Sequence, residues 1–239
     1  MKIIVALSGG MDSTTLLAAA VTSGHEVIPV SIKYGSKHND LERASAGYVA
    51  EYYKLIFAWR TLDLSKVFES FDSDLLRSGA AIPEGHYHEE SMRRTVVPFR
   101  NGIIISSLAG LAESLEAKEV WIGIHAGDHY IYLDCRPEFY SAMKDAVLRG
   151  TDRKVYLRSP FLYATKAKIL AYGLGKSRTI DLPEPSASVP YHLTRTCYTD
   201  NPVACGKCGA CQERLESFKE VGVEDHLEYQ SRELLPKKG

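Results

Sequence analysis

The stretch Ile3-Ile4-Val5-Ala6-Leu7-Ser8-Gly9-Gly10-Met11-Asp12-Ser13 decides the fold. Residues 2–7 are mostly apolar or β-branched with little alternation, which is typical of a strand buried on both faces of a parallel sheet. The two glycines permit positive φ and a close approach of the backbone to an anion. A helix from Ser13 to Val21 follows, and its free N–H groups and dipole favour phosphate. The sequence therefore predicts a strand, a phosphate-binding loop and a helix in this order.

The residue types in this loop narrow the kind of phosphate site. Ser8 and Ser13 can donate hydroxyl hydrogen bonds, and Asp12 beside phosphate implies a bridging Mg²⁺. A Walker A loop needs Gly-x-x-x-x-Gly-Lys-Ser/Thr and a dinucleotide loop needs Gly-x-Gly-x-x-Gly, and neither run occurs here. The alternative is an ordinary strand–helix turn in which Asp12 or Ser13 caps the helix.

Strands and helices alternate along the rest of the chain. We expect strands at 27–32, 55–59 and 119–124, and helices at 39–53, 101–116, 137–148 and 163–174. This order predicts an α/β fold with a doubly wound, mostly parallel, Rossmann-like sheet and right-handed crossovers. In the helix at 39–53, Tyr48 and Val49 are expected to face the core. Residues 78–91 lack an apolar period and are expected to form a long loop or a mobile lid.

Four of the five cysteines lie together near the C-terminus, at Cys197, Cys205, Cys208 and Cys211. In a cytosolic chain such a cluster indicates metal binding rather than disulfides. Four thiolates fit a closed structural zinc site, and an iron–sulfur cluster can use similar spacing. We expect residues 1–190 to form the nucleotide and substrate domain. Residues 191–239 are expected to form a metal-binding segment, with a helix at about 210–220, as part of the same structural unit.

Several other polar residues follow predicted strands or open predicted helices, where ligands bind in such sheets. Arg100 and Asn101 could face ATP, although a solvated arginine and a helix-capping asparagine would look the same. Asp134 could accept hydrogen bonds from a donor-rich heterocycle, or simply cap a helix. Arg136 could hold a carboxylate or phosphate. Lys166 could neutralise an acyl-adenylate, or lie on the surface.

Composition excludes some functional classes. The 239 residues carry 29 Lys and Arg against 30 Asp and Glu, so the net charge of −1 provides no global attraction for nucleic acid. The apolar start is too short for a signal peptide, and the sequence pattern shows no run of membrane-spanning length. We therefore expect a cytoplasmic protein that binds neither nucleic acid directly nor a membrane.

Taken together, the motifs resemble one family. They are Ser8-Gly-Gly-x-Asp-Ser13, Val97-Pro-x-Arg-Asn101, Asp134-Cys-Arg-Pro-Glu-Phe139, Thr165-Lys-Ala167, and Thr196-Cys-Tyr198 with the cysteine cluster. The loop alone resembles the PP-loop of adenine-nucleotide hydrolases, which cleave ATP between the α- and β-phosphates. The combination, spanning nearly the whole chain, resembles the 7-cyano-7-deazaguanine (preQ0) synthases.

The resemblance implies a ligase that converts 7-carboxy-7-deazaguanine and ammonia to the nitrile, with release of AMP and pyrophosphate. It implies ATP, Mg²⁺ and a structural Zn²⁺ as cofactors, and a homodimer as the oligomeric state. By the same resemblance the catalytic residues are Asp12, Ser13, Lys166 and Arg100. The nucleotide-binding residues are Leu7, Ser8, Gly9, Gly10, Met11, Asp12, Ser13, Thr14, Ser31, Asn101 and Gly123. The substrate residues are Asp134, Arg136, Phe139 and Asp128, and the metal ligands are the four clustered cysteines.

Two departures from the family pattern leave alternatives open. Phe99 stands where the family usually has glycine, and Leu133 stands where it often has proline. Alternatives are a paralogue that stops at the amide or uses another amine, and a PP-loop enzyme that modifies tRNA. A non-catalytic ATP sensor is a third alternative.

Overall fold

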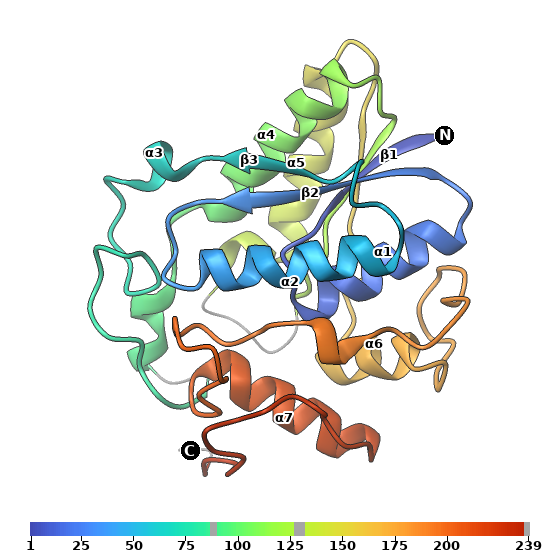
Figure 1. Ribbon diagram of the computed structural model, residues 1–239. Coiled ribbons are helices and arrows are strands. Elements are labelled where there is room, and N and C mark those ends of the chain that lie inside the picture. Colours follow the sequence, from blue (N-terminus) through green and yellow to red (C-terminus); the bar gives the residue numbers. More distant parts are fainter. Residues whose placement is uncertain (87–89, 127–131, 237–239) are drawn as a thin grey trace.

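A five-stranded parallel sheet forms the centre of the molecule in the computed structural model, which describes residues 1–86, 90–126 and 132–236 (Figure 1). The strands are β1 (Lys2–Ala6), β2 (Glu26–Lys33), β3 (Arg60–Asp63), β4 (Glu119–Trp121) and β5 (Tyr156–Arg158). Their order is β3-β2-β1-β4-β5, and every pair is parallel. This arrangement confirms the predicted doubly wound α/β fold. The strand order reverses between β1 and β4, and ligands bind beside such a reversal in doubly wound sheets.

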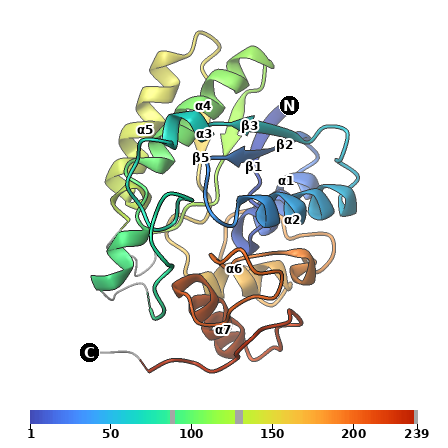
Figure 2. The ribbon, with the colours of Figure 1, turned by 60° about the vertical axis from the view of Figure 1, so that its left-hand side comes forward.

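Helices cover both faces of the sheet (Figures 1 and 2). One face carries α1 (Met11–Thr22) and α2 (Asn39–Tyr52), with α6 (Lys166–Gly173) packed on α1. The other face carries α4 (Arg100–Ser114) and α5 (Pro137–Gly150). The remaining helices are α3 (Ser65–Phe68), α7 (Gly209–Val221), and the short 3₁₀ turns η1 (Glu90–Thr95), η2 (Leu133–Cys135) and η3 (Tyr191–Leu193).

The first strand explains why both faces are covered. Ile3 and Val5 pack in the core beneath α1 and α2, whereas Ile4 packs in the core beneath α4 and α5. All three side chains are fully buried. Because successive side chains of a strand point to opposite faces, a continuous apolar strand needs a helical layer on each side.

One helical stretch, Met92–Ser114, is long and apolar enough by length and composition to cross a membrane. Half of its most apolar window is buried, and Ile105 and Leu108 of α4 pack against the sheet. The stretch therefore also fits the core helix of a soluble protein. The expectation that no run reaches this length is wrong.

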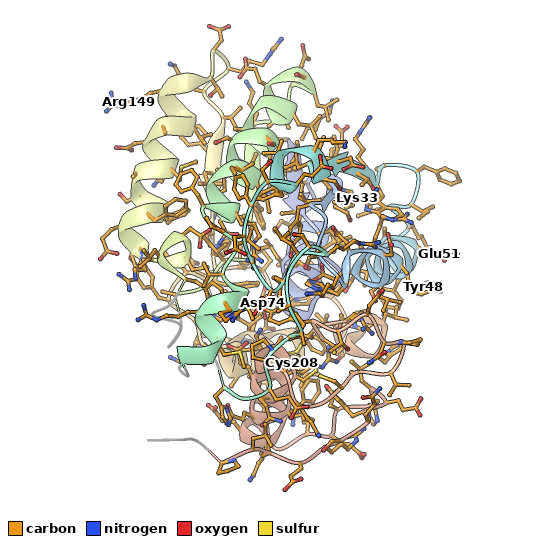
Figure 3. The ribbon with its side chains drawn as sticks, turned by 90° about the vertical axis from the view of Figure 1, so that its left-hand side faces the viewer. Lys33, Tyr48, Glu51, Asp74, Arg149 and Cys208 are labelled. Carbon is orange, nitrogen blue, oxygen red and sulfur yellow. The ribbon has the colours of Figure 1, made fainter. Side chains whose placement is uncertain are left out.

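Two local expectations are wrong. Residues 55–59 are turns rather than a strand, and the third strand begins at Arg60. Val49 is buried as expected, but Tyr48 is 60% exposed, and Figure 3 shows it with Glu51 on the outer side of α2. The helical period fits either side chain, and only the tertiary packing decides which one faces the sheet.

The segment expected to be a long loop or a mobile lid is held in place where the structure describes it. Leu75, Leu76 and Met92, which flank it, are buried. Gly85 donates its N–H to Lys207 O at 3.0 Å, which fastens the segment to the cysteine cluster. Residues 78–86 contain no helix or strand, so the long loop is confirmed for them, and residues 87–89 lie outside the described residues.

The C-terminal segment packs beneath α1 and α6 (Figure 1). The Arg195 N–H donates to Gly9 O at 2.8 Å, and Tyr191 Oη lies 2.8 Å from Thr15 Oγ1. The buried Arg214 of α7 binds Asp225 at 2.6 Å, which ties the final stretch to that helix. These contacts bring the C-terminal segment directly against the glycine loop.

Candidate active site and metal site

A cavity of about 270 Å³ opens at the carboxyl ends of β1, β2 and β4. Its polar lining includes Ser8, Gly10, Asp12, Ser13, Tyr34, His38, Glu42, Arg100, Asn101, Gly123, His125, Lys166, Arg195, Tyr198 and Glu213. These residues come from both ends of the chain and from the middle. A cleft at the reversal point of a doubly wound sheet that collects charged side chains is the default ligand site.

The glycine loop, Ser8–Ser13, is shaped by its own hydrogen bonds. Ser13 Oγ donates to Gly10 O at 3.1 Å and accepts from the Ser8 N–H at 3.2 Å. Ser8 Oγ accepts from the Gly10 N–H at 3.2 Å. Helix α1 starts at Met11 without a side-chain cap, so its first N–H groups can donate hydrogen bonds to phosphate oxygens. The loop is therefore built before the ligand arrives.

Gly9→Ala is expected to disrupt this loop. Gly9 has φ +85°, and an added Cβ would lie 2.5 Å from Glu42 O and 2.6 Å from Ala46 N, both backbone atoms of α2. The substitution should destabilise the protein by more than about 2 kcal/mol, since it adds backbone strain to a steric clash. Chemical denaturation checks this, with Gly35→Ala as a control. Gly35 has a similar φ of +81°, but the space around its Cβ position is open. Equal losses for both variants would contradict the steric account.

Three charged side chains meet beside the loop. Lys166 Nζ lies 3.2 Å from Asp12 Oδ2 and 2.7 Å from Glu213 Oε2, and Lys166 is 8% exposed. His125 Nε2 lies 3.6 Å from the same Asp12 oxygen. The lysine thus links the start of α1 to α7.

The electrostatics of this cluster fix its charges. Burial acts to raise the pKa of Asp12, but Lys166 and His125 outweigh it and hold that pKa below its usual value. Burial acts to lower the pKa of Lys166, but Asp12 and Glu213 raise it above its usual value. At neutral pH the cavity therefore presents an ionised aspartate and a charged lysine.

The structure brings most of the predicted nucleotide and catalytic residues together. Those that line the cavity are Leu7, Ser8, Gly10, Met11, Asp12, Ser13, Arg100, Asn101, Gly123 and Lys166. Gly9, Thr14 and Ser31 are not among the lining residues. Ser31 Oγ donates to Leu7 O at 2.7 Å and accepts from Trp59 Nε1 at 2.8 Å, so it links β2 to the end of β1 and to the turn before β3 rather than facing the cavity.

The predicted substrate residues lie elsewhere. Asp134 Oδ2 accepts from the Asn101 N–H at 2.9 Å and so caps the start of α4. Asp134, Arg136 and Phe139 are not among the lining residues, and Asp128 lies outside the described residues. Their role in binding the substrate stays a prediction.

Phe99, one of the two departures from the family pattern, precedes α4 with φ +52°. That conformation favours glycine, the residue that the sequence resemblance leads us to expect at this position. The Phe99 ring packs edge-to-face on Phe139 with centroids 5.7 Å apart.

Sequence reasoning missed several lining residues, namely Tyr34, His38, Glu42, Arg195, Tyr198 and Glu213. His38 and Glu42 are four residues apart at the start of α2, and His38 Nε2 lies 3.4 Å from Glu42 Oε2. An i, i+4 pair directly after a strand was the available signal. Glu213 had no local signal, because its contact with Lys166 crosses 47 residues.

The four clustered cysteines form a second site. Their sulfurs all lie within 4.8 Å of one another, with Cys197 Sγ 3.5 Å from Cys205 Sγ and Cys205 Sγ 3.9 Å from Cys211 Sγ. Metal–sulfur bonds of about 2.3 Å in a tetrahedron place the sulfurs about 3.8 Å apart. The spacing fits one metal ion, whereas a four-iron cluster would hold the thiolates farther apart.

Comparisons with known proteins agree with these features. Residues 2–222 match the family described as queuosine biosynthesis protein QueC. The chain is 45% identical to a 7-cyano-7-deazaguanine synthase of Pseudoalteromonas atlantica, over 96% of this chain and 99% of the relative. It is 44% identical to one of Desulfotalea psychrophila, over 90% of this chain and 93% of the relative.

Among solved structures, the U34-tRNA thiolase NcsA of Methanococcus maripaludis has 15% identity and a TM-score of 0.47. The match covers 80% of this chain and 61% of that chain. The family match and the two synthases, by contrast, extend over nearly the whole sequence. The chain belongs to the QueC family of queuosine biosynthesis proteins.

Proposed function

We propose that the protein is an ATP-dependent ligase that converts 7-carboxy-7-deazaguanine and ammonia to 7-cyano-7-deazaguanine, with release of AMP and pyrophosphate. The observation that carries the proposal is the cavity, which joins a glycine loop to the buried Asp12–Lys166 pair. It occurs in a chain 45% identical to a synthase with that name over nearly its full length.

The first chemical step would be adenylation of the substrate carboxylate. A carboxylate is a poor electrophile, so its oxygen attacks the α-phosphate of ATP and the bond to the β-phosphate breaks. The glycine loop and the first N–H groups of α1 would hold the β- and γ-phosphates. Lys166 would stabilise the negative charge that develops as pyrophosphate leaves, since it lies fully charged in a buried site.

The next steps remove the two carboxylate oxygens. Ammonia attacks the acyl carbon and AMP leaves, which gives the amide. A second ATP activates the amide oxygen, and loss of AMP leaves the nitrile. Arg100 lies in the same cavity, 5.7 Å from the Tyr34 ring centroid, and would hold the carboxylate or phosphate oxygens during both rounds. Positioning, rather than a nucleophilic side chain, would supply most of the catalysis.

The residues fit the implied metals. Asp12 Oδ1 is buried without a hydrogen-bond partner in the described part of the chain, as expected for a carboxylate that binds Mg²⁺ on ATP. Mg²⁺ supplies charge neutralisation on the phosphates when bound. The sulfur spacing of the cysteine cluster supports a structural Zn²⁺. Residues 1–190 and 191–239 would then act as one unit in the cytoplasm, since Glu213 of the second part reaches Lys166 of the first.

Product analysis tests the proposed function. The purified protein is incubated with ATP, Mg²⁺, ammonium chloride and 7-carboxy-7-deazaguanine. We expect AMP, pyrophosphate and the nitrile, detected by mass spectrometry. An amide as the end product would favour the paralogue that stops early. ADP, or no turnover that depends on the heterocycle, would refute the proposal.

A further inference from the structure

Glu42 and His38 line the active-site cavity but have no role in the reaction as described above. His38 is 1% exposed and stands directly before α2, and Glu42 lies in the first turn of that helix. The Glu42 backbone oxygen packs against Gly9, where an added Cβ would lie 2.5 Å from it. The pair is therefore built into the wall next to the phosphate loop.

Glu42 differs from the other two carboxylates that line the described part of the cavity. Asp12 and Glu213 both contact Lys166 within salt-bridge distance. For Glu42, no Lys or Arg of the described residues lies within that distance, and its Oε2 contacts His38 Nε2 at 3.4 Å. A largely buried carboxylate of this kind, 18% exposed, is costly unless it serves a cationic ligand or a proton transfer.

The charges around the pair keep His38 neutral and make Glu42 easy to protonate. Burial raises the pKa of Glu42 to about 8, against the opposing effects of Arg100 from α4 and Arg195 from the C-terminal segment. Burial, with the same two arginines, lowers the pKa of His38 to about 3. The neutral imidazole places Nε2 3.4 Å from Glu42 Oε2, and the same ring also meets the Tyr198 backbone. His38 therefore orients the carboxylate without neutralising it.

We propose that Glu42, oriented by His38, binds the ammonium ion and accepts its proton, so that ammonia is released beside the acyl-adenylate. This inference rests on the proposed function and assigns a site to its nitrogen substrate. Ammonium is a compact cation, and one nitrogen needs one open carboxylate oxygen. His38 lies beside Oε2, and Oε1 has no hydrogen bond or ion pair among the described residues, which suits ammonium better than the paired donors of a heterocycle edge.

The proposed step balances. One N–H bond of ammonium breaks and its proton passes to the Glu42 carboxylate. The freed lone pair forms the C–N bond to the acyl carbon, and the C–O bond to AMP breaks as AMP leaves with the bonding electrons. A second proton of the nitrogen passes to water, and nothing is oxidised or reduced. A base whose pKa lies near the working pH is suited to this transfer.

Glu42→Gln with two nucleophiles tests the inference. We expect kcat/KM for ammonium chloride to fall about 100-fold, because the amide cannot accept the proton. Hydroxylamine is largely uncharged at neutral pH, so its kcat/KM should stay near the wild-type value. In the wild type, kcat/KM for total ammonium should rise with pH as Glu42 ionises near pH 8. The variant should keep only the rise that follows the fraction of free ammonia at higher pH. Glu42→Asp should recover part of the ammonium rate.

Controls separate this inference from the proposed function. Glu51→Gln changes an exposed glutamate on the outer side of α2 (Figure 3) and should leave both rates unchanged. ATP–pyrophosphate exchange that depends on 7-carboxy-7-deazaguanine needs no ammonia, and Glu42→Gln should retain it. Absence of exchange in the wild type would refute the proposed function. Wild-type exchange combined with an unchanged ammonium rate in Glu42→Gln would refute the ammonium site alone. Loss of exchange in Glu42→Gln, or a raised KM for the heterocycle, would also overturn it, by placing Glu42 in ATP or heterocycle binding.

Discussion

Lys166→Met is expected to lower kcat by about 1,000-fold or more, since it removes the buried cation that we propose stabilises the departing pyrophosphate. The variant also leaves the carboxylates of Asp12 and Glu213 in a largely buried site without the charged Lys166 amino group that contacts both of them. Like charges in such a site raise a carboxylate pKa and cost stability. We therefore expect a lower unfolding free energy as well, measured by chemical denaturation alongside initial rates of pyrophosphate release.

A double variant separates the two effects. Lys166→Met with Glu213→Gln removes the repulsion, so stability should return while kcat stays low. Lys168→Met changes an exposed lysine on the same helix and should alter neither property. Recovery of activity in the double variant would show that Lys166 acts only through stability, and would contradict its assignment to catalysis.

Cys205→Ser is expected to release the metal and to destabilise the protein by about 3 kcal/mol or more, since the binding energy of a structural metal is folding energy. The cysteine cluster holds α7 at Cys208 and Cys211, and Glu213 follows two residues later. Activity should therefore fall together with metal content. Metal analysis and thermal unfolding measure the effect.

The fifth cysteine provides the control for metal content. Cys135 lies outside the cluster, and Cys135→Ser should retain a full complement of metal. Wild-type metal content and stability in Cys205→Ser would contradict a structural metal site. The same measurement identifies the metal, because the sulfur spacing fits one tetrahedral metal ion per chain, for which zinc is the expectation, rather than an iron–sulfur cluster.

The fold could be predicted from sequence because its elements are locally determined. The apolar run of β1 and the glycine loop each carry a signal within a few residues, and the structure places them as expected. β5 (Tyr156–Arg158) was missed, because three residues are too few to show a period. The turn at 55–59 is apolar enough to suggest a strand, but Leu55 and Trp59 pack against the core, Ile56 and Phe57 are exposed, and none of them pairs with β2.

The site was predictable only in part, for the same physical reason. The loop residues and Lys166 lie in motifs, whereas Glu213 and Arg195 reach the cavity through contacts that only the folded chain creates. Asp134 shows the reverse case. A lone aspartate before a helix has the same sequence signal whether it faces a ligand or, as here, accepts a hydrogen bond from the Asn101 N–H of another helix.

The most direct measurement of the central claim follows the carboxylate oxygens. 7-Carboxy-7-deazaguanine labelled with ¹⁸O in both carboxylate positions is turned over with ATP and ammonium, and the nucleotide products are analysed by mass spectrometry. Since each carboxylate oxygen should leave on an adenylate, we predict two singly labelled AMP molecules for each nitrile formed. Label in inorganic phosphate, with ADP as the product, would show phosphorylation instead of adenylation and would contradict the account.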